Sequence, residues 1–168
     1  MLEIYKETLP FPLAKLIIGI FAAISLSLLV LLLYQVLGGP VGDNPAPDWF
    51  YLIMFLFFAG LTYFMTNFNK LSIKITTESI TVGYGVLRRA IPWDNVNGCY
   101  QDEASAIGHY GGWGIRMGKV KRKWRLVYNV MGCPTVVLEL DKGRFKEFVF
   151  STKNPEMVLE VARQQISK

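Results

Sequence analysis

Apolar and polar positions are segregated along this chain of 168 residues. Between Pro12 and Phe68 the apolar residues form two dense blocks, and this stretch contains only one Lys and two Asp. The first block, residues 13–37, has 25 residues, and the second block, residues 49–68, has 20 residues. About 20 residues in helical conformation cross the hydrocarbon of a bilayer, so each block is long enough to span it. The pattern therefore predicts two transmembrane helices.

After the second block the chain alternates between apolar and polar residues, which is typical of half-buried strands. The alternation is visible in five segments: "LSIKIT" (71–76), "SITVGYG" (79–85), "VLRRAIPW" (86–93), "TVVLEL" (135–140) and "RFKEFVF" (144–150). The tripeptide "DKG" (141–143) predicts a hairpin between the last two segments, because Gly accepts the positive φ of a tight turn. From Pro155 onward the apolar residues recur at helical spacing, which predicts a C-terminal amphipathic helix.

These elements predict a membrane α-helical hairpin followed by an α+β domain. The N-terminal segment and the two transmembrane helices occupy residues 1–69, and the domain occupies residues 70–168. In the domain we expect about seven antiparallel strands in a bent sheet or partly open barrel, with the C-terminal helix capping one end.

The distribution of charge predicts how the protein lies in the membrane. The loop between the blocks, residues 38–48, contains no Lys or Arg, whereas Lys6, Lys15, Lys70 and Lys74 lie on the other side. Loops rich in Lys and Arg stay in the cytoplasm, so we expect a multi-pass protein of the cell membrane with both termini and the C-terminal domain cytoplasmic. A cleaved signal peptide is disfavoured, because the first block is longer than the usual apolar core of about 7–15 residues.

The soluble part is basic, since residues 1–68 carry a net charge of −2 and residues 69–168 carry +7. Five of the seven residues of "KVKRKWR" (119–125) are basic, namely Lys119, Lys121, Arg122, Lys123 and Arg125, and Arg88 and Arg89 form a second basic pair. Nucleic-acid binding is disfavoured, because Trp124 is the only aromatic residue in the cluster that could stack on a base. A solvated hairpin and contact with anionic lipid headgroups remain as interpretations of these seven residues.

Residue types that support transport or catalysis are sparse. The two apolar blocks contain no Asp, Glu, His or Arg, so an ion or proton pathway is disfavoured. His109 is the only histidine, and adjacent Asp102 and Glu103 point in opposite directions on extended chain. Cys99 and Cys133 lack the C-x-x-C spacing of a metal or redox motif, and we expect both to be reduced in the cytoplasm. We therefore expect no catalytic residue, no metal and no cofactor.

Five segments of the domain carry a resemblance to a known family: "ITTESITVGYGVLRRAIPWDNV" (75–96), "GGWGIR" (111–116), "WRLVYNVMG" (124–132), "VVLELDKGRFKEF" (136–148) and "NPEMV" (154–158). In this order they resemble the pleckstrin-homology-like (PH-like) fold, and more narrowly the prokaryotic PH-like domains that follow a pair of transmembrane helices. The resemblance implies a fold and a membrane context, but it implies no reaction.

The sequence as a whole predicts a membrane-anchored, non-enzymatic interaction or scaffold module. We expect membrane lipids around the two helices, and protein partners or further copies of the chain as the binding partners of the domain. One alternative is recognition of anionic headgroups by the basic hairpin 119–125. An enzyme is the other alternative, and it requires a groove in which His109 meets Asp102 or Glu103.

Overall fold

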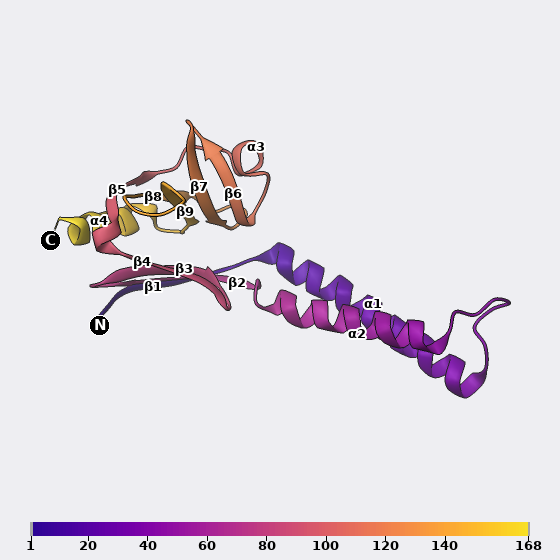
Figure 1. Ribbon diagram of the computed structural model, residues 1–168. Helices are drawn as coiled ribbons and strands as arrows, with labels where there is room; N and C mark the ends of the chain where they lie inside the picture. The colour runs from indigo at the N-terminus through magenta and orange to yellow at the C-terminus, as the bar shows by residue number, and fades with distance from the viewer. Residues whose placement is uncertain (1, 168) are drawn as a thin grey trace. The chain divides into compact units, whose positions relative to one another are not determined.

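The computed structural model describes residues 2–167. The chain forms two compact units. One unit combines the residues up to Phe11 with those from Lys70 onward, and the other is residues Pro12–Asn69. Figure 1 shows a pair of long helices for the second unit and a β-rich domain for the first.

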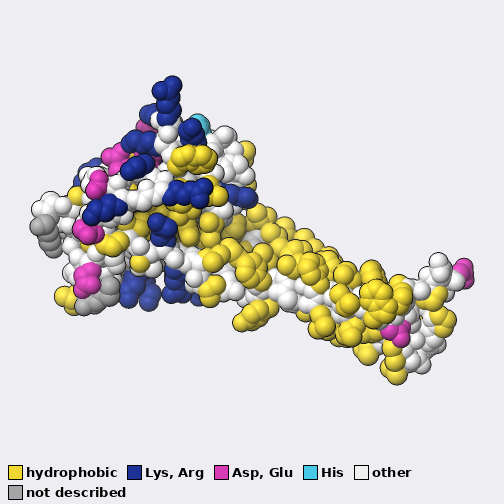
Figure 2. Space-filling model, viewed as in Figure 1, with side chains coloured by type: hydrophobic (Ala, Val, Ile, Leu, Met, Phe, Trp, Pro, Cys, Tyr) yellow, Lys and Arg dark blue, Asp and Glu magenta, His cyan; other side chains and the backbone are white. Residues whose placement is uncertain are grey.

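The helical unit contains α1 (Pro12–Gly38) and α2 (Asp48–Thr66), which lie side by side (Figure 1). Phe21 and Phe58 make an edge-to-face ring contact with centroids 5.9 Å apart. No side chain of α2 is buried, and apolar side chains cover the surface of both helices (Figure 2). Both helices are long and apolar enough to span a membrane, in agreement with the two predicted spans.

The domain begins with a four-stranded antiparallel sheet in the order β1–β2–β3–β4. Its strands are β1 (Glu3–Pro10), β2 (Lys70–Thr76), β3 (Ser79–Tyr84) and β4 (Leu87–Pro92). β1 and β2 are direct neighbours although the whole helical unit lies between them in sequence, and Pro10 pairs with Lys70. The sequence-based division at residue 69 placed residues 3–10 with the helices, whereas in the structure they form a strand of the domain. The helices are therefore an insertion between two paired strands.

A second sheet of five strands has the order β5–β8–β9–β7–β6. Its strands are β5 (Val96–Gln101), β6 (Gly114–Val120), β7 (Lys123–Asn129), β8 (Thr135–Leu140) and β9 (Glu147–Ser151). The pair β7–β9 is parallel, because the chain crosses to β8 before it returns to β9. The described residues thus form nine strands in two sheets, one of them mixed, and no closed barrel, where about seven antiparallel strands were expected.

Three short helical elements complete the domain: η1 (Trp93–Asn95), α3 (Ala106–Tyr110) and α4 (Pro155–Ile166). α4 confirms the predicted C-terminal helix and buries Val158, Leu159 and Ala162. It packs against β5 and β8, and so covers one end of the five-stranded sheet.

The two sheets are joined by buried aromatic side chains. Tyr84 of β3 stacks on Tyr128 of β7 with ring centroids 6.3 Å apart, and Phe148 of β9 also packs against Tyr128, with centroids 5.3 Å apart. Trp93 donates a hydrogen bond from its indole nitrogen to the Thr76 carbonyl at 2.9 Å. The inner faces of both sheets therefore share one core, in which the isoleucines and valines of β2 and β3 are fully buried.

Candidate functional site

A cleft of about 660 Å³ opens on the five-stranded sheet, beside the β6–β7 hairpin. All five strands of this sheet, the segment after β5 and the β6–β7 turn line it with these residues: Tyr100, Gln101, Asp102, Glu103, Ala104, His109, Val120, Lys121, Lys123, Arg125, Glu139 and Glu147. Its lining combines acidic, basic and phenolic side chains with few apolar ones. A cleft of this composition can hold a polar or charged group.

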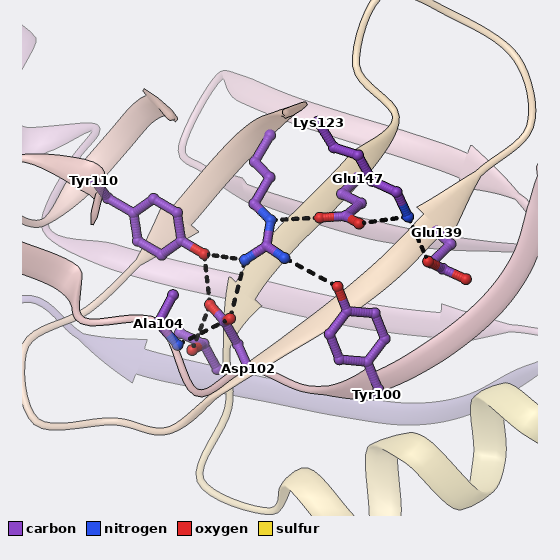
Figure 3. Close-up of polar contacts among 9 residues, drawn as sticks. Tyr100, Asp102, Ala104, Tyr110, Lys123, Glu139 and Glu147 are labelled. Atoms are coloured by element: carbon purple, nitrogen blue, oxygen red, sulfur yellow. Dashed lines mark hydrogen bonds and ion pairs between the residues drawn. The ribbon is translucent and has the colours of Figure 1, made fainter. Parts of the chain in front are cut away.

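Arg125 lies at the base of this cleft and is only 4% exposed. Its Nε bonds to the Glu147 carboxylate, and its Nη1 lies 3.0 Å from Asp102 Oδ1. Nη1 also donates to the Tyr110 hydroxyl at 2.7 Å, and Nη2 donates to the Tyr100 hydroxyl at 3.0 Å (Figure 3). A buried charge is stable only when it is paired and hydrogen-bonded, and Arg125 meets both conditions.

The Asp102 carboxylate is also saturated. Besides Arg125 it accepts hydrogen bonds from the Tyr110 hydroxyl at 2.6 Å and from the Ala104 amide at 3.1 Å (Figure 3). The Thr135 hydroxyl donates a further hydrogen bond to this carboxylate at 3.4 Å. Burial, followed by the hydrogen bond to Asp102, raises the pKa of Tyr110 above its ordinary range. Tyr110 therefore remains a neutral donor, and the segment from Asp102 to Tyr110 is fixed over the sheet at both ends.

A second ion-pair group continues toward the rim of the cleft. Lys123 bridges Glu139 at 2.9 Å and the buried Glu147 at 3.0 Å (Figure 3). These two hydrogen bonds raise the pKa of Lys123, so its ammonium group stays charged. Arg125 and Lys123 both extend from β7 on the same face, because they are two residues apart on a strand.

The predicted basic cluster therefore divides between the cleft and the tip of the hairpin. Lys123 and Arg125 are occupied by carboxylates, whereas Lys119, Lys121 and Arg122 form no ion pair with any described residue. Lys119 instead lies over the ring of exposed Trp124, 5.9 Å from its centroid. The tip residues are the ones that remain available to an anionic partner.

The backbone of this tip is strained. Lys121 and Arg122 have φ values of 47° and 68° and are the only described residues other than glycine with positive φ. Positive φ at both central residues is the geometry of a tight two-residue hairpin turn, where Asn-Gly is preferred. Long cationic side chains occupy this turn in spite of the backbone cost, and such local strain is typical of functional positions.

Arg88 and Arg89 lie elsewhere in the domain. Both are on β4, an edge strand of the four-stranded sheet, and both are exposed. Their side chains point to opposite faces, because Arg88 pairs with Gly83 and Arg89 with buried Val82. The structure thus places this pair in a different sheet from the β6–β7 hairpin.

His109, Asp102 and Glu103 do line the same cleft. Within residues 2–167, however, the His109 imidazole has no hydrogen bond to either carboxylate, and Asp102 is already saturated by Arg125 and Tyr110. The described part of the chain also contains no group of three His, Cys, Asp or Glu side chains that could hold a metal ion. Cys99 and Cys133 are free, half-buried thiols, and burial raises the pKa of both.

The sequence analysis missed four side chains that bind Arg125 or Lys123, namely Tyr100, Tyr110, Glu139 and Glu147. The alternation in β7 carried one usable signal, since it places Lys123 and Arg125 on one face and Trp124 on the other. The carboxylate partners carried no local signal, because they come from strands that become neighbours only when the sheet forms.

Comparison with known proteins gives no match, whether to a family model, to a curated protein or to a solved structure. The structure itself defines the class of protein. It has two long helices apolar enough to span a membrane and a β-rich domain of two sheets with a C-terminal helix.

Proposed function

We propose that the protein is a multi-pass cell-membrane protein whose PH-like domain lies on the cytoplasmic face as a non-enzymatic interaction module. The observation that carries this proposal is the pairing of β1 with β2 around the inserted helices. In this role the domain binds protein partners or assembles with further copies of itself.

The pairing supports a two-span topology. Only Phe11 separates β1 from α1, and only residues 67–69 separate α2 from β2. Because Pro10 pairs with Lys70, the chain must enter and leave the helical unit on one side of a membrane. The loop of residues 39–47 then lies on the opposite side, and its lack of Lys and Arg favours export of that loop.

The surface of the helices supports a membrane location. Apolar side chains such as Leu37 and Tyr63 are 82% and 78% exposed. A monomeric soluble protein rarely exposes a contiguous apolar surface of this extent. A lipid environment removes that surface from water, which is favourable by about 25 cal/mol for each Å² of apolar area removed.

The order of elements supports the PH-like assignment in part. A series of mostly antiparallel strands precedes the C-terminal helix α4, as the resemblance implies. The parallel pair β7–β9 departs from the antiparallel arrangement that we expected. The domain is therefore proposed as a variant of the PH-like architecture.

The chemistry of the cleft favours binding over catalysis. Its buried ionisable groups, Asp102, Arg125 and Glu147, bond to one another, so they are not free to act as an acid, a base or a nucleophile. The rim presents charges of both signs from Glu103, Lys121 and Glu139. Such a rim complements a protein surface that also carries both signs.

The proposal is tested by cross-linking in native membranes. A photoreactive amino acid replaces Lys121 at the rim of the cleft, and in a matched variant it replaces Lys142 in the β8–β9 turn. We expect Lys121 to yield a discrete cross-linked product, with a partner or with a second copy of the chain, that is absent with Lys142. The same product spectrum at both positions contradicts the cleft as the binding site. Light scattering of the purified protein in detergent then separates self-assembly from a foreign partner.

Recognition of anionic headgroups by Lys119, Lys121 and Arg122 is a second candidate function. The observation that favours it is the exposed, unpaired turn with its strained backbone. It predicts that changing the three residues to Ser weakens the contact of the domain with anionic vesicles into which the full chain is reconstituted. Equal contact with neutral and anionic vesicles contradicts it.

A further inference from the structure

The β3–β4 turn lies at the end of the four-stranded sheet from which the chain continues into the helices. The register aligns Leu9, Leu71, Tyr84 and Leu87 in one row across the four strands. One residue further along, Pro10 and Lys70 form the last pair of β1 and β2, and the two-residue turn Gly85–Val86 closes β3 onto β4 at the same level. Adjacent strands are about 4.8 Å apart, so this turn lies within about 10 Å of Lys70.

The outer face of this sheet is basic. Its outward positions alternate with buried Leu71, Ile73 and Val82, and no described helix covers them. Four basic side chains occupy this face: Lys6, Lys70, Lys74 and Arg88. Lys74 is paired with Glu3 at 3.1 Å, whereas the other three have no carboxylate partner within residues 2–167. Figure 2 shows Lys and Arg side chains gathered along this side of the domain.

Apolar side chains are exposed at the end of this sheet that is next to the helix connection. Val86 is 74% exposed, and Leu87 beside it is also exposed. Gly85, with a φ of 48°, makes the turn that projects Val86 beyond the last strand pair. Apolar side chains next to Lys and Arg are the composition that binds the boundary between headgroups and acyl chains.

The β6–β7 hairpin points away from the place where the chain continues into the helices. Its base is near the helix connection, since a Cβ on Gly114 would lie 4.0 Å from the Phe11 ring. Its tip is six residues further along β6, and at about 3.4 Å for each residue the tip lies about 20 Å from Phe11. Lys121 and Arg122 are thus the cationic residues far from the connection, and Lys70 and Arg88 are the ones close to it.

We infer that this end of the four-stranded sheet rests on the bilayer that α1 and α2 span. In this arrangement Lys6, Lys70 and Arg88 bind the phosphate groups of anionic lipids, and Val86 inserts at the interface. The inference rests on the proposed function, because it requires the two helices to be in the membrane. It assigns the β6–β7 tip and the charged cleft to the side that faces other molecules, and so it excludes headgroup recognition by Lys119, Lys121 and Arg122.

The contact is tested on the full chain in vesicles, because the domain needs β1 and is not complete without the residues before the helices. Val86→Cys, in a background with Cys99→Ala and Cys133→Ala, carries an environment-sensitive fluorophore. Arg122→Cys in the same background is the matched control at the other end of the domain. The vesicles contain phosphatidylcholine with acyl chains that quench the fluorophore, either alone or mixed with phosphatidylglycerol.

We expect quenching at position 86 to be several-fold stronger than at position 122, and to be stronger in the anionic vesicles. Equal quenching at both positions, or none at position 86, overturns the inference while co-flotation of the protein with the vesicles still supports the membrane anchor. Loss of co-flotation overturns the anchor and this inference together.

Charge variants separate a specific contact from general attraction. The triple variant Lys6→Gln, Lys70→Gln and Arg88→Gln is compared with the equally charged variant Lys119→Gln, Lys121→Gln and Arg122→Gln. Each basic residue near an anionic leaflet changes the binding equilibrium about five-fold, so three change it about a hundred-fold. We expect the first variant to reduce quenching at position 86 to the level in neutral vesicles and the second to leave it unchanged. An equal effect of the two variants overturns the inference.

Discussion

The Tyr84 hydroxyl donates a hydrogen bond to the carbonyl oxygen of Asn129 at 2.7 Å, and this bond links the two sheets of the domain. Tyr84 belongs to β3 and Asn129 to the end of β7, and both residues are buried. The bond therefore connects the four-stranded sheet to the sheet that carries the charged cleft.

Tyr84→Phe should lower the free energy of unfolding of the domain by about 1–2 kcal/mol, because it leaves the buried Asn129 carbonyl without this donor. Denaturant unfolding of the full chain in detergent measures the change. Tyr34→Phe, on a side chain exposed in α1, is the control and should have no effect on the domain. Equal stability of Tyr84→Phe and the parent contradicts the role assigned to the hydroxyl.

Arg125→Ala should destabilise the domain by about 3–5 kcal/mol, because it leaves the Asp102 and Glu147 carboxylates buried without their cation. Arg122→Ala, three residues away at the exposed tip, should change stability by less than about 0.5 kcal/mol. The same unfolding measurement on both variants tests the prediction. A small effect of Arg125→Ala means that the guanidinium does not hold the cleft together.

The turn offers a stabilising change. Lys121→Asn with Arg122→Gly should raise the free energy of unfolding by about 1 kcal/mol, because Asn and Gly adopt positive φ with less strain. The matched double change to Ala removes the same charges but keeps the strained backbone, so it should bring no gain. If both doubles stabilise equally, relief of charge repulsion rather than backbone strain is the cause.

Stability should fall above about pH 10. The pKa of Tyr110 is raised from its ordinary value of 10.0, first by burial and then by the hydrogen bond to Asp102. The folded state thus holds the Tyr110 proton more tightly than the unfolded state does. The stabilisation that this proton provides is complete below the pKa of Tyr110 in the unfolded state, and it is lost as pH rises through the pKa in the folded state. Tyr84 and Lys123 are shifted in the same direction.

Unfolding measured at several pH values above about 9 tests this linkage. The free energy of unfolding of Tyr110→Phe should fall less steeply with pH than that of the parent, by up to about 1.4 kcal/mol for each pH unit, because one titrating proton is removed. An unchanged slope shows that Tyr110 does not titrate differently in the folded and unfolded states.

β1 provides a test of the domain boundary. Leu9 of β1 is fully buried, so Leu9→Ala should cost about 2–4 kcal/mol of domain stability. Ile4 on the same strand is 42% exposed, and Ile4→Ala should cost much less. Similar small effects of both changes contradict the assignment of residues 3–10 to the sheet.

The sequence predicted the elements whose signal is local. The long apolar runs of α1 and α2 and the helical spacing after Pro155 needed no knowledge of neighbours. β1 escaped detection because Leu9 is the only residue of the strand that is buried, so the alternation is weak. Its position before the helices also gave no indication that its partner begins at Lys70.

The site was predictable only in part, because its partners are distant in sequence. The cluster at residues 119–125 was visible, but Arg125 meets Glu147 through the parallel register of β7 and β9. A parallel pair cannot be inferred from two alternating segments, since alternation specifies neither direction nor neighbour. For this reason Arg125, which the sequence suggested as a surface charge, is a buried cation that holds the structure together.

The position of the helices between β1 and β2 also sets an order of events during biosynthesis. When β1 leaves the ribosome, its partner strand has not yet been made, and residues 11–69 must follow before Lys70 appears. β1 therefore waits unpaired while both apolar helices are synthesised. The first sheet can close only after both helices have been made, so pairing of β1 with β2 marks that the whole segment from Pro12 to Asn69 has been synthesised.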